Sequence, residues 1–299
     1  MPGRGRGMNF FIDLAQTLIN GILQGGVYAA AAVGLSLIFG VSGILNAAHG
    51  ELVMLGAFAT YWLFTLYQVD PLLTLPISFA LLFVLGYALQ YFLLNRTLGR
   101  PLLLSLLVTF GISLVLVNVA LRLWSGDHRM MRIPYFAHSL IVGPFIIPQS
   151  RVVACVVGVG MVAGLSWMLA ATRLGRMIRA TAQDWEMARM VGVDPKRIYA
   201  VTFGIGAGTS GVAGSLVAFY TPVEPNMGLT YTLFAFAVVV LGGLGYTAGV
   251  VWGGLTLGIA QALTETYLES GLSLLVAFVL LYVILRFMPA GIMRKGRVE

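Results

Sequence analysis

Residues 173–197 read RLGRMIRATAQDWEMARMVGVDPKR, and this stretch decides how the rest of the chain is interpreted. It holds six Arg or Lys and three acidic residues, whereas the flanking stretches, residues 152–172 and 198–223, contain no charged residue. Each flanking stretch is long enough to cross a hydrocarbon core about 30 Å thick, which takes about 20 helical residues. The segment is therefore predicted to be a structured cytoplasmic loop between two membrane helices.

The same segment has the signals of a helix. Its apolar residues recur at spacings of three and four, which predicts one helical face formed by Ile178, Ala182, Trp185 and Ala188. Gly192 predicts a left-handed stop, and Asp194 followed by Pro195 is typical of the N-cap and first turn of the next helix. Two interpretations stay open: an ordinary basic loop that follows the positive-inside rule, or a docking helix for a cytoplasmic partner.

Composition sets the class of the protein. Of 299 residues, 59% are hydrophobic and 10% are charged, and the mean hydropathy is +0.92. A chain this apolar is not a soluble domain, so we expect an all-α, polytopic integral membrane protein. The net charge of +7 comes from basic residues in short loops, where membrane orientation explains them, and nucleic-acid binding is not expected. The single Cys155 excludes an intramolecular disulfide.

The gaps between charges predict eight or nine transmembrane or re-entrant helices. Besides the two stretches named above, the charge-free runs are residues 14–50, 52–69, 71–95, 101–121, 225–264 and 270–285. The first and the fifth of these are too long for one crossing and must be broken or doubled. In residues 225–264 the expected break is the glycine-rich stretch 242–245.

Orientation follows from the basic residues. If residues 173–197 are cytoplasmic, counting crossings places the C-terminal tail, residues 293–299, inside and the long connection, residues 123–150, outside. Residues 1–17 are interpreted as an extension and interfacial lead, with Met8 as the natural start, and residues 18–292 as the membrane domain. The beginning of the chain lacks a secretory signal with a small-residue cleavage site, so the first span is expected to stay in the mature protein.

Enzyme chemistry has little support in the sequence. The two lysines, Lys196 and Lys295, lie outside any phosphate-binding loop motif, so ATP hydrolysis by the usual route is excluded and no cofactor is expected in this chain. The three histidines are scattered and show no metal-ligand spacing. A transport function therefore fits the chain better than a catalytic one.

One polar cluster lies between two apolar runs, at Asn46, His49 and Glu51. An ionisable group at membrane depth is costly unless it faces water or a partner, which makes the cluster a functional candidate. The alternative is a loop at the membrane surface, where the same side chains satisfy exposed helix ends. Spacing alone does not decide between the two.

The order of motifs resembles the LivH-type permeases of bacterial ABC importers for branched-chain amino acids. The motifs are GGVYAAAAVGLSLIFGVSGILNAAHGELVMLGAF, GRMIRATAQDWEMARMVGV, LGGLGYTAGVVWGGLTLGIAQAL and MPAGI, in that order, and the similarity covers nearly the whole chain. The resemblance implies a transmembrane permease subunit in the bacterial inner membrane, paired with a second homologous permease, two P-loop ATPase subunits that bind the ATP, and a periplasmic solute-binding protein. Tyr246 departs from the family pattern, which more often has a small residue there, and this puts substrate details in doubt.

Site residues follow from the resemblance and the physical pattern together. The middle motif corresponds to a coupling helix, and its contact residues are expected to be Arg179, Ala180, Ala188 and Gly192. The translocation path is expected to be lined by Asn46, His49, Glu51, Gly242, Gly243 and Tyr246. The rival function is an ion- or proton-coupled secondary transporter, for which His49 and Glu51 are the only plausible groups. Branched-chain amino acids are the expected substrates, with urea, amides and aromatic acids as alternatives.

Overall fold

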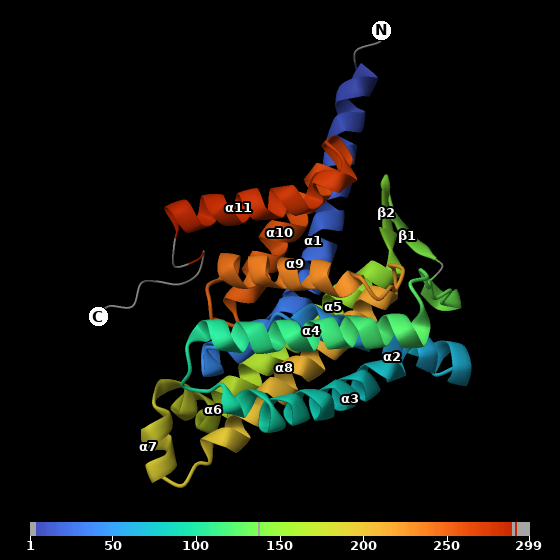
Figure 1. The fold of residues 1–299 in the computed structure, drawn as a ribbon. Coiled ribbons are helices and arrows are strands. Elements are labelled where there is room, and N and C mark those ends of the chain that lie inside the picture. Colours follow the sequence, from blue (N-terminus) through green and yellow to red (C-terminus); the bar gives the residue numbers. More distant parts are fainter. Residues whose placement is uncertain (1–3, 137, 289–290, 292–299) are drawn as a thin grey trace.

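The computed structural model describes residues 4–136, 138–288 and 291, and it is a bundle of helices with one small β-hairpin (Figure 1). The helices are α1 (Arg4–Ser42), α2 (His49–Tyr67), α3 (Pro71–Phe92), α4 (Leu102–Trp124), α5 (Gln149–Ala171), α6 (Arg173–Gln183), α7 (Trp185–Met190), α8 (Pro195–Ala218), α9 (Met227–Gly242), α10 (Gly249–Tyr267) and α11 (Ser273–Phe287). The hairpin pairs β1 (Ser139–Val142) with β2 (Phe145–Pro148) in antiparallel register. The expected all-α class is confirmed, and the hairpin is an addition that the sequence analysis did not foresee.

Five helices, α1, α3, α4, α5 and α8, are long and apolar enough to cross a membrane. Among the described residues, four further helices of fifteen or more residues, α2, α9, α10 and α11, complete a set of nine that agrees with the predicted eight or nine. Of the residues in the apolar stretch of α8, 94% are buried, against 17% to 22% in α3, α4 and α5. Thus α8 lies at the centre, and the outer helices expose apolar faces to the surroundings.

Small residues let the other helices approach α8 closely. A Cβ atom on Gly56 of α2 would collide with the backbone of Gly211, and one on Gly34 of α1 would collide with the carbonyl oxygen of Gly206. On the α3 side, a Cβ on Gly86 would collide with the Ala207 side chain. Backbone-to-backbone contact of this kind replaces the hydrophobic effect as the source of cohesion between membrane helices.

The bundle has two distinct ends (Figure 1). We call them the hairpin end, which carries β1, β2 and the loop between α8 and α9, and the α7 end, which carries α6, α7 and the connection from α3 to α4. Basic residues gather at the α7 end, in residues 96–100 and 173–197. The predicted tail, residues 293–299, lies outside the described residues.

Loops at the hairpin end are tied to one another. Arg129 and Val223 form an isolated antiparallel bridge, which joins the long connection to the loop between α8 and α9. The Tyr135 hydroxyl donates a hydrogen bond of 3.0 Å to the Asp70 carboxylate, and burial together with that carboxylate raises the pKa of Tyr135 to about 12. The connection predicted to be external is therefore an ordered part of the bundle.

Both long charge-free runs are broken, as predicted. In residues 225–264 the break is the stretch after Gly242, where Gly243 and Gly245 have φ angles of 102° and 76°. In residues 14–50 the break comes after Ser42, and Gly43 has a φ of 67°. Glycine adopts these left-handed angles without the steric cost that a Cβ brings.

Candidate functional site

Helix α2 begins inside the bundle rather than at its surface. His49, its first residue, is fully buried, and its Nε2 lies 2.7 Å from the carbonyl oxygen of Ala31 in α1. Eleven residues separate Ala31 from the end of α1 at Ser42, which is about 16 Å of helical rise at 1.5 Å per residue. Residues 43–48 therefore return from the α7 end to the middle of the bundle before α2 starts.

Threonine side chains from two other helices satisfy the backbone at this break. The Ala47 amide donates to the Thr109 hydroxyl of α4 at 3.1 Å, and the Gly50 amide donates to the Thr232 hydroxyl of α9 at 2.8 Å. The Asn46 side-chain oxygen accepts a bond from the Ala48 amide at 3.1 Å. Irregular backbone at membrane depth is tolerated only where protein or water forms hydrogen bonds to its polar groups. Here protein side chains form three of these bonds.

The polar side chains of the break are only partly satisfied. The Ser113 hydroxyl donates to Glu51 Oε1 at 2.7 Å, while Glu51 Oε2 and Asn46 Nδ2 have no hydrogen-bond partner among the described residues. Because a carbonyl only accepts, the His49 Nε2 that contacts Ala31 carries a proton. The cluster thus offers an unfilled acceptor and an unfilled donor, and it lies at the N-terminus of α2, where the helix dipole favours a negative group.

These observations decide where the cluster lies but not what it does. Asn46, His49 and Glu51 are at most 4% exposed, so they lie in the interior of the protein and not in an exposed loop. The cluster instead packs against α9, because a Cβ on Gly228 would come within 2.9 Å of Glu51 Oε2. A role for the three residues in translocation stays a prediction.

The glycine-rich turn between α9 and α10 is separate from this cluster. Gly242 and Gly243 are buried and Tyr246 is 46% exposed, at the α7 end of α9, whereas the cluster contacts the opposite half of α9. Gly40 of α1 packs on the turn at Gly245, and Gly291 packs on it at Gly243. Three of the motifs that carried the family resemblance therefore meet at this turn.

Residues 173–197 form two short helices instead of one. Asp184 ends α6 and caps α7, since its Oδ1 accepts bonds from the Glu186 and Met187 amides at 2.9 and 3.0 Å. The predicted single apolar face is therefore wrong: Ile178 and Ala188 are buried, but Ala182 and Trp185 are exposed, because the axis changes direction between them. The predicted stop at Gly192, with a φ of 86°, and the Asp194 cap on α8 are confirmed.

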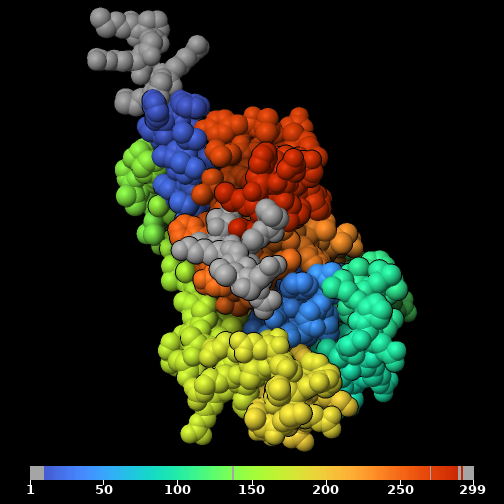
Figure 2. Space-filling model, turned by 90° about the vertical axis from the view of Figure 1, so that its left-hand side faces the viewer, coloured from blue at the N-terminus to red at the C-terminus, as the bar shows by residue number. Residues whose placement is uncertain are grey.

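The predicted coupling residues fall in different environments. The Arg179 guanidinium donates to the Leu169 carbonyl, so that it ties α6 to the end of α5. Ala180 is exposed, whereas Ala188 is 3% exposed and packs within its own chain. Gly192 lines a cavity of about 800 Å³ at the α7 end, together with Trp185, Arg189, Lys196 and Ser42. Figure 2 faces this end, with the blue end of α1 between the yellow α7 segment and the teal start of α4.

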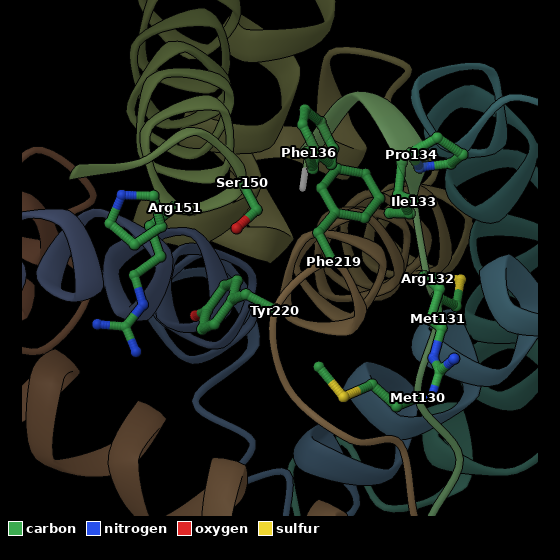
Figure 3. A pocket seen from close by; sticks show the side chains of 11 residues that line it. Met130, Met131, Arg132, Ile133, Pro134, Phe136, Ser150, Arg151, Phe219 and Tyr220 are labelled. Carbon is green, nitrogen blue, oxygen red and sulfur yellow. The ribbon is translucent and has the colours of Figure 1, made fainter. Parts of the chain in front are cut away.

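A second cavity, of about 540 Å³, lies at the hairpin end and was missed by the sequence analysis (Figure 3). Residues from the long connection, the start of α5 and the end of α8 line it, including Met131, Arg132, Phe136, Arg151, Phe219 and Tyr220. These segments are far apart in the sequence, and no local motif joins them. The local signal is Arg151 at the start of an apolar helix, but its partners come only from the fold.

Comparison with known proteins identifies the family. The model of the family described as "Branched-chain amino acid transport system / permease component" matches residues 17–285. The chain belongs to this family. Among its relatives are BraD of Pseudomonas aeruginosa, a high-affinity branched-chain amino acid transport system permease protein that is 32% identical over 95% of this chain and 97% of its own length, and LivH of Escherichia coli K12, 32% identical over 97% and 98%. LivM of Escherichia coli K12 is 25% identical over 91% of this chain and 68% of its own length. No solved structure matches.

Family membership decides between the two functions considered above. This branched-chain permease family member is a multi-pass membrane transport subunit, and the expectation that it is not an enzyme agrees with the family. The alternative of an ion-coupled secondary transporter is not supported, because the relatives are subunits of named transport systems.

Proposed function

We propose that the chain is the permease subunit of an ATP-driven importer of branched-chain or related amino acids in a bacterial inner membrane. The observation that carries the proposal is the start of α2 at the middle of a family-matched membrane bundle, with unfilled polar atoms around it. Discontinuous helices near the midplane are the usual place for small-solute binding in transporters. A zwitterionic amino acid meets a helix amide end and a carboxylate there.

The translocation path in this proposal passes two places. Asn46, His49 and Glu51 border it at the midplane, and Gly242, Gly243 and Tyr246 border it at the α7 end. All of these residues except Tyr246 are buried in this structure, so the path opens through relative movement of α1, α2 and α9. Glycine contacts between the helices allow such sliding without the interlocking of large side chains.

Coupling in this proposal uses residues 173–197 at the α7 end. Two P-loop ATPase subunits, which bind the ATP, lie in the cytoplasm against α6 and α7, and the C-terminus lies on the same side. The basic residues of the α7 end support that orientation through the positive-inside rule. The bond from Arg179 to the end of α5 gives α6 a direct mechanical link to a membrane helix.

The proposed assembly has further members. A second permease completes the membrane part, which is supported by the similarity of this chain to both LivH and LivM of Escherichia coli. A periplasmic solute-binding protein delivers the ligand to the hairpin end. The chain is not expected to bind nucleic acid. The bilayer surrounds the exposed apolar faces of α3, α4 and α5.

Transport in a reconstituted system tests the substrate. The chain is purified from its own membranes with the subunits that accompany it and placed in proteoliposomes with internal or external ATP. Uptake of labelled leucine that needs ATP and the binding protein is the expected result. Leucine uptake driven by a proton or sodium gradient without ATP would overturn the proposal.

A matched pair of variants tests coupling. Ala180 and Ala182 are both exposed and small, and they lie on opposite faces of α6. We expect Ala180→Arg to abolish substrate-stimulated ATP hydrolysis in the assembled complex by excluding the ATPase, and Ala182→Arg to leave it unchanged. Ala188 is unsuitable for this test because it is buried in its own chain. Equal behaviour of the two variants would contradict the docking face.

A further inference from the structure

Helix α4 is the most weakly held of the five helices that are long enough to cross a membrane. It lies on the outside of the bundle, and 17% of its apolar stretch is buried, the lowest share of the five (Figure 1). Its buried residues form one narrow stripe of small side chains: Ser105, Thr109, Ser113 and Ala120. All of α4 is described, and none of its large apolar side chains is fully buried. Moving α4 away from the bundle therefore exposes little apolar surface of its own.

One face of α2 leads from the polar cluster to the hairpin end, and α4 covers it. Spacings of three and four place these residues on that face: Glu51, Met54, Phe58 and Trp62. At the inner end the Ser113 hydroxyl bonds to Glu51, and farther out the Trp124 ring stacks on Phe58 with 4.2 Å between the centroids. From Glu51 to Trp62 the helix rises about 16 Å. Thus α4 closes this face from the cluster outward.

Arg129 fastens α4 at the hairpin end. Its guanidinium carbon lies 5.0 Å from the ring centroid of Trp62 and 5.8 Å from that of Tyr61, both in α2. Its Nη2 donates to the Trp124 carbonyl at the end of α4, at 2.8 Å. Its backbone amide and carbonyl pair with Val223, in the loop that leads to α9, at 2.9 and 2.7 Å. One residue therefore joins the ends of α2 and α4 to the start of α9.

The fastening contains no ion pair. Among the described residues no carboxylate pairs with Arg129, and both its Nε and the Trp62 Nε1 are buried without a hydrogen-bond partner. The charge is held by aromatic rings and by one carbonyl oxygen. Release of Arg129 consequently leaves no buried carboxylate behind, so it costs less than breaking a buried ion pair.

We propose that α4 is the outer gate of the translocation path and that Arg129 is the positioning residue that holds this gate closed. When the guanidinium leaves Trp62 and the stack of Trp124 on Phe58 separates, α4 moves away from α2. The polar cluster then becomes accessible from the hairpin end. The direction of transport rests on the proposed function, whereas the contacts that close α4 on α2 rest on the structure alone.

Reaction of a single thiol behind the gate tests the proposal. Met54 is 0% exposed and lies on the covered face of α2. Cys155 is replaced by Ala, Met54→Cys is introduced, and the complex in lipid nanodiscs is treated with a charged, water-soluble thiosulfonate. We expect slow reaction in this background. Adding Arg129→Gln, which removes the charge but keeps the backbone bridge to Val223, should raise the rate about tenfold or more.

Three controls separate gating from general loosening. Arg132→Gln removes the same charge three residues along the same connection, where the side chain lines the hairpin-end cavity, and should leave the rate unchanged. Arg129→Lys keeps a cation for the rings and should reverse part of the acceleration. A second reporter, Leu257→Cys in α10, is buried among residues of α1 and α9 and should stay slow in every background.

A double variant tests whether Arg129 acts through Trp62. Trp62→Leu should accelerate the reaction as Arg129→Gln does, and the two together should be no faster than either alone, because both remove the same contact. Accelerations that multiply would show independent effects and overturn the role given to this contact. Equal acceleration at the Met54 and Leu257 reporters would show a loosened bundle and overturn the gate, as would no acceleration by Arg129→Gln.

Locking the gate gives a second test, which decides if Arg129→Gln fails to assemble. Phe58→Cys and Trp124→Cys, joined by oxidation in the background without Cys155, should stop leucine uptake, and a reductant should restore it. Uptake that continues with the disulfide formed would overturn the gate. The thiol rates need no substrate, so they decide the gate even if the complex transports a solute other than leucine.

Discussion

The start of α2 and the α6–α7 segment are both interruptions between helices, and they are stabilised in opposite ways. At the start of α2 the free backbone amides find their partners on α4 and α9, in the hydroxyls of Thr109 and Thr232. In the α6–α7 segment each helix start is capped from its own neighbourhood, by Thr172, Asp184 and Asp194. One interruption depends on the whole fold, and the other is locally self-sufficient.

The difference follows from access to water. Near the surface an uncapped amide can bind water, so a local cap adds only a modest amount to stability. In the middle of a membrane bundle water is scarce, and an unpaired amide retains its full desolvation cost. Changes at the start of α2 should therefore damage the whole protein, whereas changes in α6–α7 should damage coupling and leave the bundle intact.

Gly50→Ala should have the largest effect on stability. The added Cβ would collide with the Gly228 carbonyl oxygen and the Thr232 hydroxyl, so α2 and α9 must separate. Overpacking of this kind costs about 3 kcal/mol when backbone is the obstacle. The measurement is the thermal midpoint of the purified protein in detergent, followed by size-exclusion chromatography.

Gly111→Ala is the matched control for that variant, since Gly111 of α4 has no atom within 4 Å of an added Cβ. We expect its midpoint to equal or exceed that of the wild type, because alanine is the better helix former. Equal loss of stability in both variants would mean that the contact between Gly50 and α9 is unimportant.

Thr232→Val should have an intermediate effect. It keeps the shape of the side chain but leaves the Gly50 amide without its acceptor, which costs about 1 to 3 kcal/mol in a buried setting. Thr256→Val serves as the comparison, because among the described residues the hydroxyl of the half-buried Thr256 bonds only to the Trp252 carbonyl of its own helix. A midpoint for Thr232→Val no lower than that for Thr256→Val would refute the dependence of α2 on α9.

Asp184→Ala should have the smallest effect on stability. The loss of the cap on α7 costs about 1 kcal/mol locally, and the cost should appear as faster amide hydrogen exchange in residues 185–190. The thermal midpoint of the bundle should not change. Asp184→Asn, which keeps an acceptor oxygen, should restore the exchange rates. If Asp184→Ala lowered the midpoint as much as Thr232→Val, the contrast between the two regions would be lost.

Local sequence features predicted much of this fold because membrane helices are governed by short-range rules. Uninterrupted apolar runs predicted the helices, and the glycines at residues 242–245 and at position 192 predicted two breaks. The split at Asp184 has a local signal as well, since Asp is a strong helix cap, but the apolar spacing across it predicts one continuous face. The β-hairpin at residues 139–148 had a Gly-Pro turn between β-branched residues as its signal.

The sequence by itself determined the class of the protein, its family and the identity of its polar residues, because composition and motif order are properties of the linear chain. Only the tertiary structure decided that α2 begins at mid-depth, that Glu51 meets Ser113, and that Gln16 bonds to the backbone of Ile146. The partners in these contacts are separated by 62 residues in one case and by more than a hundred in another, as the bond between Gln16 and Ile146 illustrates. No spacing rule reaches that far, since the contacts arise from how the helices pack around α8.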